Sequence, residues 1–203
     1  PQKEKVAIDE NCSCSPIKGY GESKFLAENE VKKLGGNINW TIIRPPFIFG
    51  PYDYDTLLVF KLIKYGVKLY MGQKFFSFVF SQDLAQAIIK IMDNNKSFGK
   101  TYFVCYPKYT SQTTFLNTIS YFVNKNAKWV RIHPNFFVAG ATLLQPILKK
   151  NSPINRIKFK EIKQNYWLCC PEKIKKELSI ECKTSLENAV RKTYEWYKIN
   201  NLI

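Results

Sequence analysis

The first half of the sequence alternates short runs of β-forming residues with segments of helical periodicity, and this alternation constrains the fold more than any other feature. The β-forming runs are residues 39–43, 67–71, 75–80 and 101–105. The segments in which apolar residues recur at helical spacing are 21–34, 56–65, 81–92 and 111–123. Because two parallel strands need a long crossover that is usually a helix, the pattern predicts an α/β fold with a partly parallel sheet.

The second half predicts a helix-rich lobe with small strands. A long helix is expected from Pro134 to about Lys150, and the final helix follows a capping box formed by Thr184 and Glu187. In the first half, Ser81 is expected to cap its helix, with Asp83 in the first turn. The remaining expected elements are strands at 129–132 and 166–169 and helices at 155–163 and 171–178.

The net charge of +15 raises the possibility of a nucleic-acid partner, but the distribution of the charge does not favour one. The chain has 27 Lys against 4 Arg, whereas base edges are read mainly by Arg. The lysines are also dispersed, and no run exceeds a pair. We therefore expect no nucleic-acid partner, and a basic nucleic-acid binder remains the weakest hypothesis.

The apolar and cysteine patterns exclude several other classes. The longest apolar stretch, 136–148, has 13 residues, and a membrane-spanning helix needs about 20, so no membrane partner is expected. The six cysteines form C-x-C and C-C pairs and not paired C-x-x-C knuckles, and His133 is the only histidine, so we expect no metal site and no hydrolase triad. The thiols are expected to be reduced, as in a cytoplasmic protein.

Chemistry is indicated by Tyr20 and Lys24, which a helix places on one face. An unperturbed tyrosine titrates near pH ~10 and is a poor base at neutral pH. A neighbouring ammonium stabilises the phenolate, so the pair could exchange a proton with a substrate hydroxyl or carbonyl. A Y-x-x-x-K spacing alone is weak evidence, because both residue types are common here.

Four segments in order make the sequence resemble the extended short-chain dehydrogenase/reductases, also called the NAD-dependent epimerase/dehydratase family. Residues 9–28 include D-E, a proline and Y-G-x-S-K-x-x-x-E, similar to the active-site helix and its approach. Residues 40–51 (WTIIRPPFIFGP) resemble the following strand and the turn beside the nicotinamide. Residues 78–88 and 171–197 resemble the family's F-V-x-V-x-D-x-A-x-A segment and its C-terminal signature.

The resemblance implies a role for each matching residue. Tyr20 would be the catalytic acid/base, and Lys24 would hold the nicotinamide ribose and tune Tyr20. Pro45, Pro46 and Phe47 would line the nicotinamide pocket.

The resemblance also implies two supporting roles and a division of the chain. Arg44 would anchor structure, and Asp83 would cap its helix. Residues 1–133 would form the remainder of a Rossmann-like domain with the active-site helix and inserted substrate-lobe strands. Residues 134–203 would be mostly the substrate-binding and C-terminal lobe, with interleaved boundaries.

The family's glycine-rich turn, which cradles the cofactor pyrophosphate, has no counterpart in this sequence. We therefore expect a C-terminal fragment of a longer enzyme that uses NAD or NADP and is inactive as an isolated chain. A small-molecule substrate and a possible homodimer are expected by the same resemblance.

The leading hypothesis is an NAD(P)-dependent oxidoreductase acting at a hydroxyl or ketone carbon, similar to dihydroflavonol reductases and 3β-hydroxysteroid dehydrogenases. A nucleotide-sugar epimerase or dehydratase is the alternative, because it would share the first hydride step. A non-catalytic binding module that retains the enzyme fold is a third possibility.

Overall fold

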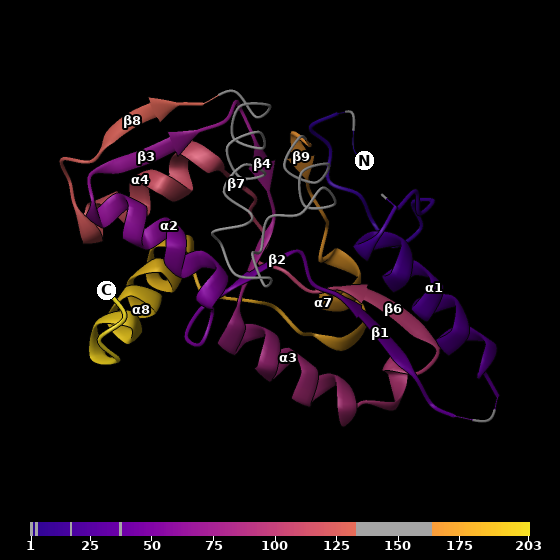
Figure 1. Ribbon diagram of the computed structural model, residues 1–203. Coiled ribbons are helices and arrows are strands. Elements are labelled where there is room, and N and C mark those ends of the chain that lie inside the picture. The colour runs from indigo at the N-terminus through magenta and orange to yellow at the C-terminus, as the bar shows by residue number, and fades with distance from the viewer. Residues whose placement is uncertain (1, 3, 17, 37, 133–163) are drawn as a thin grey trace.

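The computed structural model describes residues 2, 4–16, 18–36, 38–132 and 164–203 (Figure 1). His133 and the helices expected at 134–150 and 155–163 lie outside the described residues. In the first half, the elements are α1 (Tyr20–Lys33), β1 (Thr41–Arg44), β2 (Phe47–Phe49), α2 (Tyr54–Lys64), β3 (Val67–Tyr70), β4 (Phe75–Phe76), β5 (Phe78–Phe80), α3 (Ser81–Met92), the short 3-10 helix η1 (Asn95–Ser97) and β6 (Lys100–Phe103). These are followed by β7 (Thr110–Ser111), α4 (Gln112–Val123), β8 (Lys128–Arg131), β9 (Tyr166–Trp167), α7 (Glu172–Leu178) and α8 (Leu186–Ile199).

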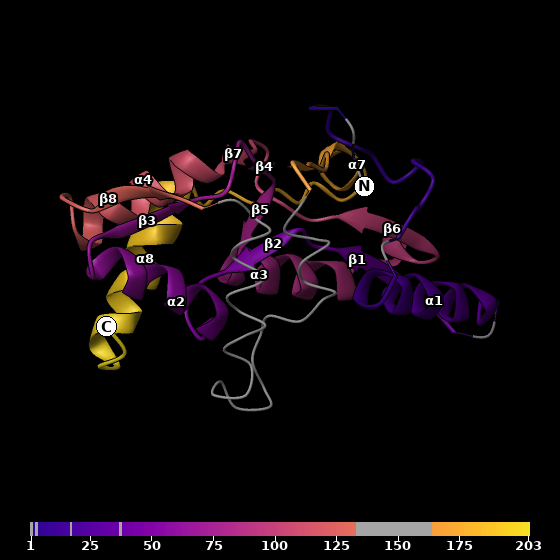
Figure 2. The same ribbon diagram turned by 45° about the horizontal axis from the view of Figure 1, so that its top comes forward.

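The strands pair mostly in parallel, which confirms the expected α/β class. Parallel ladders join β1 to β6, β2 to β5 and β3 to β8. A three-stranded sheet has the order β7–β4–β9, in which β4 runs antiparallel to β7 and parallel to β9. This last sheet joins segments from the middle and the end of the chain, and it lies between α1 and the β3–β8 pair in both views (Figures 1 and 2).

Strand β2 was not predicted. The two prolines after β1 end its ladder, since proline lacks the N–H that a ladder requires. The chain then resumes an extended path, in which Phe47–Phe49 pairs with β5 instead of β6. The Pro45–Pro46 step therefore moves the backbone from one parallel pair to the next.

The end of β2 also approaches the start of α3 closely. Gly50 has a φ of 156°, and a Cβ atom built on it would overlap the hydroxyl group of Ser81. A larger residue at this position would push the two elements apart.

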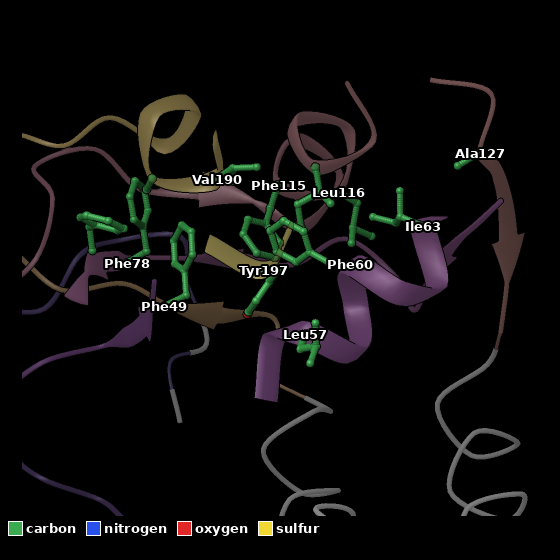
Figure 3. Close-up of a cluster of buried hydrophobic side chains, with 13 residues drawn as sticks. Phe49, Leu57, Phe60, Ile63, Phe78, Phe115, Leu116, Ala127, Val190 and Tyr197 are labelled. Carbon is green, nitrogen blue, oxygen red and sulfur yellow. The ribbon is translucent and has the colours of Figure 1, made fainter. Parts of the chain in front are cut away.

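The main core lies between α2, α4, α8 and the β2–β5 pair (Figure 3). Its centre is aromatic: Phe49 and Phe115 pack edge to face with ring centroids 5.4 Å apart, and Phe60 and Tyr197 do the same at 5.1 Å. Each such pair adds about 0.5–1.5 kcal/mol to the area it buries. A second core cluster packs α3 and α7 against β5 and β6.

Helix α1 differs from the other long helices because none of its residues is buried. It lies beside β1 at one side of the structure (Figure 1). Among the described residues, no helix combines the length and hydrophobicity that crossing a bilayer requires.

Candidate active site

A cavity of about 740 Å³ opens between α1, the β1–β2 connection, β4, α4 and β9. All five predicted site residues line it, namely Tyr20, Lys24, Pro45, Pro46 and Phe47. Its volume is typical of pockets that hold small ligands. The structure thus brings together residues that are separated by most of α1 and the whole of β1.

Tyr20 is the first residue of α1. The helix begins after Gly19, whose φ of 106° is in the region that favours glycine, and the Gly19 N–H donates to the carboxylate of Glu22 at 3.4 Å. The Lys24 ammonium lies 5.5 Å from the centroid of the Tyr20 ring, and 64% of the Tyr20 surface is exposed. The phenol is therefore accessible to a ligand, with a positive charge nearby.

Arg44 connects the helix that carries Tyr20 to β1. Its guanidinium donates twice to Glu28 of α1, from Nε at 2.8 Å and from Nη2 at 2.5 Å. The side chains of Arg44 and Glu28 are only 16% and 17% exposed. The hydrogen bond to the Glu28 carboxylate raises the pKa of Arg44. Arg44 thus has a structural contact of the kind that the sequence indicated.

The expected helix caps are corrected at two places. Asp83 does not cap its own helix: its carboxylate accepts from the backbone N–H and the hydroxyl of Thr184, at 2.8 and 2.7 Å. Ser81 is the first residue of α3 and makes no capping hydrogen bond. At the final helix, Ser185 takes the capping position predicted for Thr184, and its hydroxyl accepts from the N–H of Asn188. Thr184 is displaced because its polar groups are used by Asp83.

The cavity wall opposite α1 is strongly aromatic. Phe47 packs edge to face on Phe76 and Phe115, with centroids 5.3 and 5.6 Å apart. Phe75 and Trp167 extend the same wall. The composition of the wall favours a ligand with an apolar body.

Four polar residues of the cavity were missed in the sequence, and they are Gln2, Lys74, Gln112 and Gln164. Burial lowers the pKa of Lys74, whose ammonium donates to the backbone oxygen of Gln164 at 3.1 Å. The side-chain oxygen Oε1 of Gln112 is buried and has no hydrogen-bond partner. Lys74 is one of 27 lysines, so residue type alone could not single it out.

The cysteines do not form a metal site in the part of the chain that the structure describes. Cys105 and Cys169 are buried with their sulfur atoms 3.5 Å apart, and all six thiols are free. The hydrogen bond with Cys169 and burial both raise the pKa of Cys105. A thiol held in its protonated form is a poor nucleophile.

Comparison with known proteins yields one family match. A family model described as the NAD dependent epimerase/dehydratase family matches residues 1–105. No match was found among curated proteins.

Solved structures with a similar fold include three sugar-nucleotide and cofactor complexes. A UDP-glucose 4-epimerase from Thermotoga maritima, solved with UDP-glucose, is 15% identical with a TM-score of 0.77, over 99% of this chain and 60% of that one. A dTDP-glucose 4,6-dehydratase from Bacillus anthracis in complex with NAD is 16% identical with a TM-score of 0.74, over 98% and 58%. The protein RMD from Pseudomonas aeruginosa, complexed with NADPH, is 12% identical with a TM-score of 0.72, over 96% and 60%.

At these identities the likeness is one of fold, and it confirms the expected α/β arrangement of the Rossmann-like kind. The chain spans about three-fifths of the length of each of these structures.

Proposed function

The chain belongs to the NAD dependent epimerase/dehydratase family, and on that premise we propose that it acts as a nicotinamide-dependent oxidoreductase on a hydroxyl or ketone carbon. The observation that carries the proposal is the meeting of Tyr20, Lys24 and the segment Pro45–Phe47 at one cavity. Solved relatives in fold with NAD or NADPH bound support the use of such a cofactor.

The residues of the cavity suit the nicotinamide end of NAD or NADP. Lys24 has an ammonium whose donors match ribose hydroxyls, and Phe47 offers an apolar ring face. Pro45 and Pro46 have no N–H group, so they present apolar surface without an unsatisfied donor. When bound, the nicotinamide would supply or accept the hydride.

Tyr20 would handle the proton. In reduction, its phenol would donate a proton to the substrate oxygen; in oxidation, the phenolate would accept the proton of the substrate hydroxyl. Lys24 would place its positive charge beside Tyr20, at a distance of 5.5 Å from the centre of the ring. Arg44 would keep both residues in place by fixing α1 to β1.

The substrate that fits the cavity best has an apolar body. The charged side chains that line it, among the described residues, are Lys24 and Lys74, and no arginine does so. Diphosphate groups are most often gripped by the bidentate fork of arginine. Apart from Tyr20, six aromatic side chains of the cavity instead offer stacking surface, and they are Phe47, Phe75, Phe76, Phe103, Phe115 and Trp167.

A nucleotide-sugar epimerase or dehydratase is the second candidate. It is favoured by the similarity in fold to enzymes whose names specify UDP-glucose and dTDP-glucose. The two candidates differ in cofactor balance: an oxidoreductase leaves a net change in the redox state of the cofactor, whereas an epimerase or dehydratase regenerates its cofactor in each cycle.

The test replaces Tyr20 by Phe in the complete enzyme, because the isolated chain is expected to be inactive, and measures turnover of a panel of cyclic ketones with NADH and with NADPH. Loss of acid/base catalysis should lower turnover by about 10²–10⁴-fold. The matched control is Tyr65→Phe, because Tyr65 is 80% exposed and lies outside the cavity. Unchanged turnover in Tyr20→Phe would refute the mechanism. Conversion of a sugar nucleotide without net oxidation of the cofactor would support the second candidate.

A further inference from the structure

Lys74 and Gln112 lie next to each other at one end of the β4–β7 ladder, and both line the cavity. In the antiparallel ladder of β4 and β7, Phe76 pairs with Thr110 and Phe75 with Ser111. Lys74 precedes β4, and Gln112 is the first residue of α4. The N–H of Gln112 donates to the backbone oxygen of Lys74 at 2.9 Å, so the two residues are neighbours in space.

The neighbouring sheet contributes apolar surface to the cavity. Phe76 of β4 pairs with Trp167 of β9, and both residues line the cavity together with Lys74 and Gln112. The cation of Lys74 and the amide of Gln112 therefore lie beside the aromatic surface formed by Phe76 and Trp167. The sheet lies apart from α1, which carries Tyr20 and Lys24 (Figures 1 and 2).

The amide of Gln112 has unused hydrogen-bonding capacity. Its Oε1 atom is the one buried side-chain oxygen or nitrogen without a partner among the described residues. Such atoms are rare in folded proteins, and leaving a buried acceptor unpaired is unfavourable. The last torsion of a glutamine side chain is soft, so a modest rotation can turn this oxygen towards a donor in the cavity.

We propose that Lys74 and Gln112 are specificity-determining residues that bind a hydroxyl group on a ring-bodied substrate, at a position away from the reacting carbon. The inference rests on the proposed function, because it takes the cavity as the substrate pocket. A hydroxyl fits this pair since it accepts from the ammonium of Lys74 and donates to Oε1 of Gln112. The ring system bearing it would lie on Phe76 and Trp167.

Other groups match the pair less well. A carboxylate can accept from Lys74 but has no proton to donate, so Oε1 of Gln112 would stay unpaired. A methyl group satisfies neither residue and would bury both against an apolar surface. The pair should therefore prefer a phenol or alcohol to a carboxylate or a hydrocarbon of the same shape.

The test measures the binding of 2-naphthol and of 2-methylnaphthalene to the chain by equilibrium dialysis, without cofactor or turnover. The unmodified chain should bind 2-naphthol about tenfold more tightly, from the net value of its added hydrogen bonds. Gln112→Met and Lys74→Met should each lower this ratio severalfold. Gln112→Glu keeps an acceptor and should keep the preference, which separates loss of the contact from loss of folding.

Three controls locate the effect. Gln82→Met and Lys64→Met alter exposed residues outside the cavity and should leave the ratio unchanged. Tyr20→Phe should also leave the binding ratio unchanged, because the hydroxyl group of 2-naphthol is expected to bind at Lys74 and Gln112 and not at α1. A ratio near one in the unmodified chain, a tenfold ratio that survives Gln112→Met, or a ratio abolished by Tyr20→Phe would each overturn the assignment. None of these outcomes depends on turnover, so the failure of this inference is distinguishable from failure of the proposed oxidoreductase.

Discussion

Removal of the Glu28 charge should selectively detach α1 from β1. The double hydrogen bond between Arg44 and Glu28 joins a helix without buried residues to the sheet. Breaking a buried ion pair at one partner costs about 3–5 kcal/mol, whereas an exposed pair contributes about 0.2–1 kcal/mol. Because the two side chains are 16% and 17% exposed, we expect Glu28→Gln to lower the free energy of unfolding by about 2 kcal/mol.

Urea unfolding followed by circular dichroism measures this change. A loss of about 2 kcal/mol is roughly 30-fold in the unfolding constant. With an m value of about 2 kcal/mol per molar urea, the midpoint should fall by about 1 M. The matched control is Glu30→Gln, because Glu30 pairs with Lys33 on the same helix but the two side chains are 70% and 69% exposed. Equal midpoints for Glu28→Gln and Glu30→Gln would refute the view that the Arg44 contact holds this helix.

Three further predictions concern the rest of the fold. Asp83→Ala should lower the free energy of unfolding by about 1.5–3 kcal/mol, because the Asp83 carboxylate accepts two hydrogen bonds from Thr184. As a control, Asp93→Ala at an exposed position should change it by less than about 0.5 kcal/mol. Equal urea midpoints for the two variants would contradict this prediction. Burial raises the pKa of Tyr197 from 10.0 to about 12, so the folded state holds the phenol proton more tightly than the unfolded state does. The folded state therefore loses stability as the pH rises from 10 to 12. Over this pH range, the thermal midpoint of Tyr197→Phe should fall less than the midpoint of the unmodified chain. Gly50→Ala should be more destabilising than Gly36→Ala in thermal unfolding, because both glycines have positive φ but only at Gly50 would the new Cβ overlap a side chain; similar losses would show that this close approach does not matter.

Local periodicity was sufficient to predict most elements of the fold. Helix α4 begins after Ser111, whose hydroxyl accepts from the N–H of Thr114, so the polar residue before an apolar stripe was a reliable signal there. Strand β2 was missed because its three residues are too few to show periodicity and follow two prolines. The caps near Ser81 and Thr184 were misplaced because a tertiary contact through Asp83 competed with local capping.

Only some of the residues at the candidate site could be predicted from the sequence. Tyr20 and Lys24 were found because helical spacing links them, and Pro45–Phe47 because a family motif contains them. Lys74 and Gln112 meet through a backbone hydrogen bond beside the β4–β7 ladder, which joins segments distant in the sequence and which no local pattern encodes. Their position in the cavity depends on the sheet register and could be learned only from the folded chain.

The exposure of α1 determines which of its residues can be substituted without loss of stability or function. Tyr20, Lys24 and Glu28 are spaced four apart and form one stripe along the helix. None of the other positions is buried, so substitutions there should lose less packing energy than substitutions in the core. A saturation scan of the helix should show three intolerant positions at this spacing within an otherwise permissive segment. Selection on this helix would then act mainly on the residues needed for catalysis and for attachment to β1, and most of its other residues could vary.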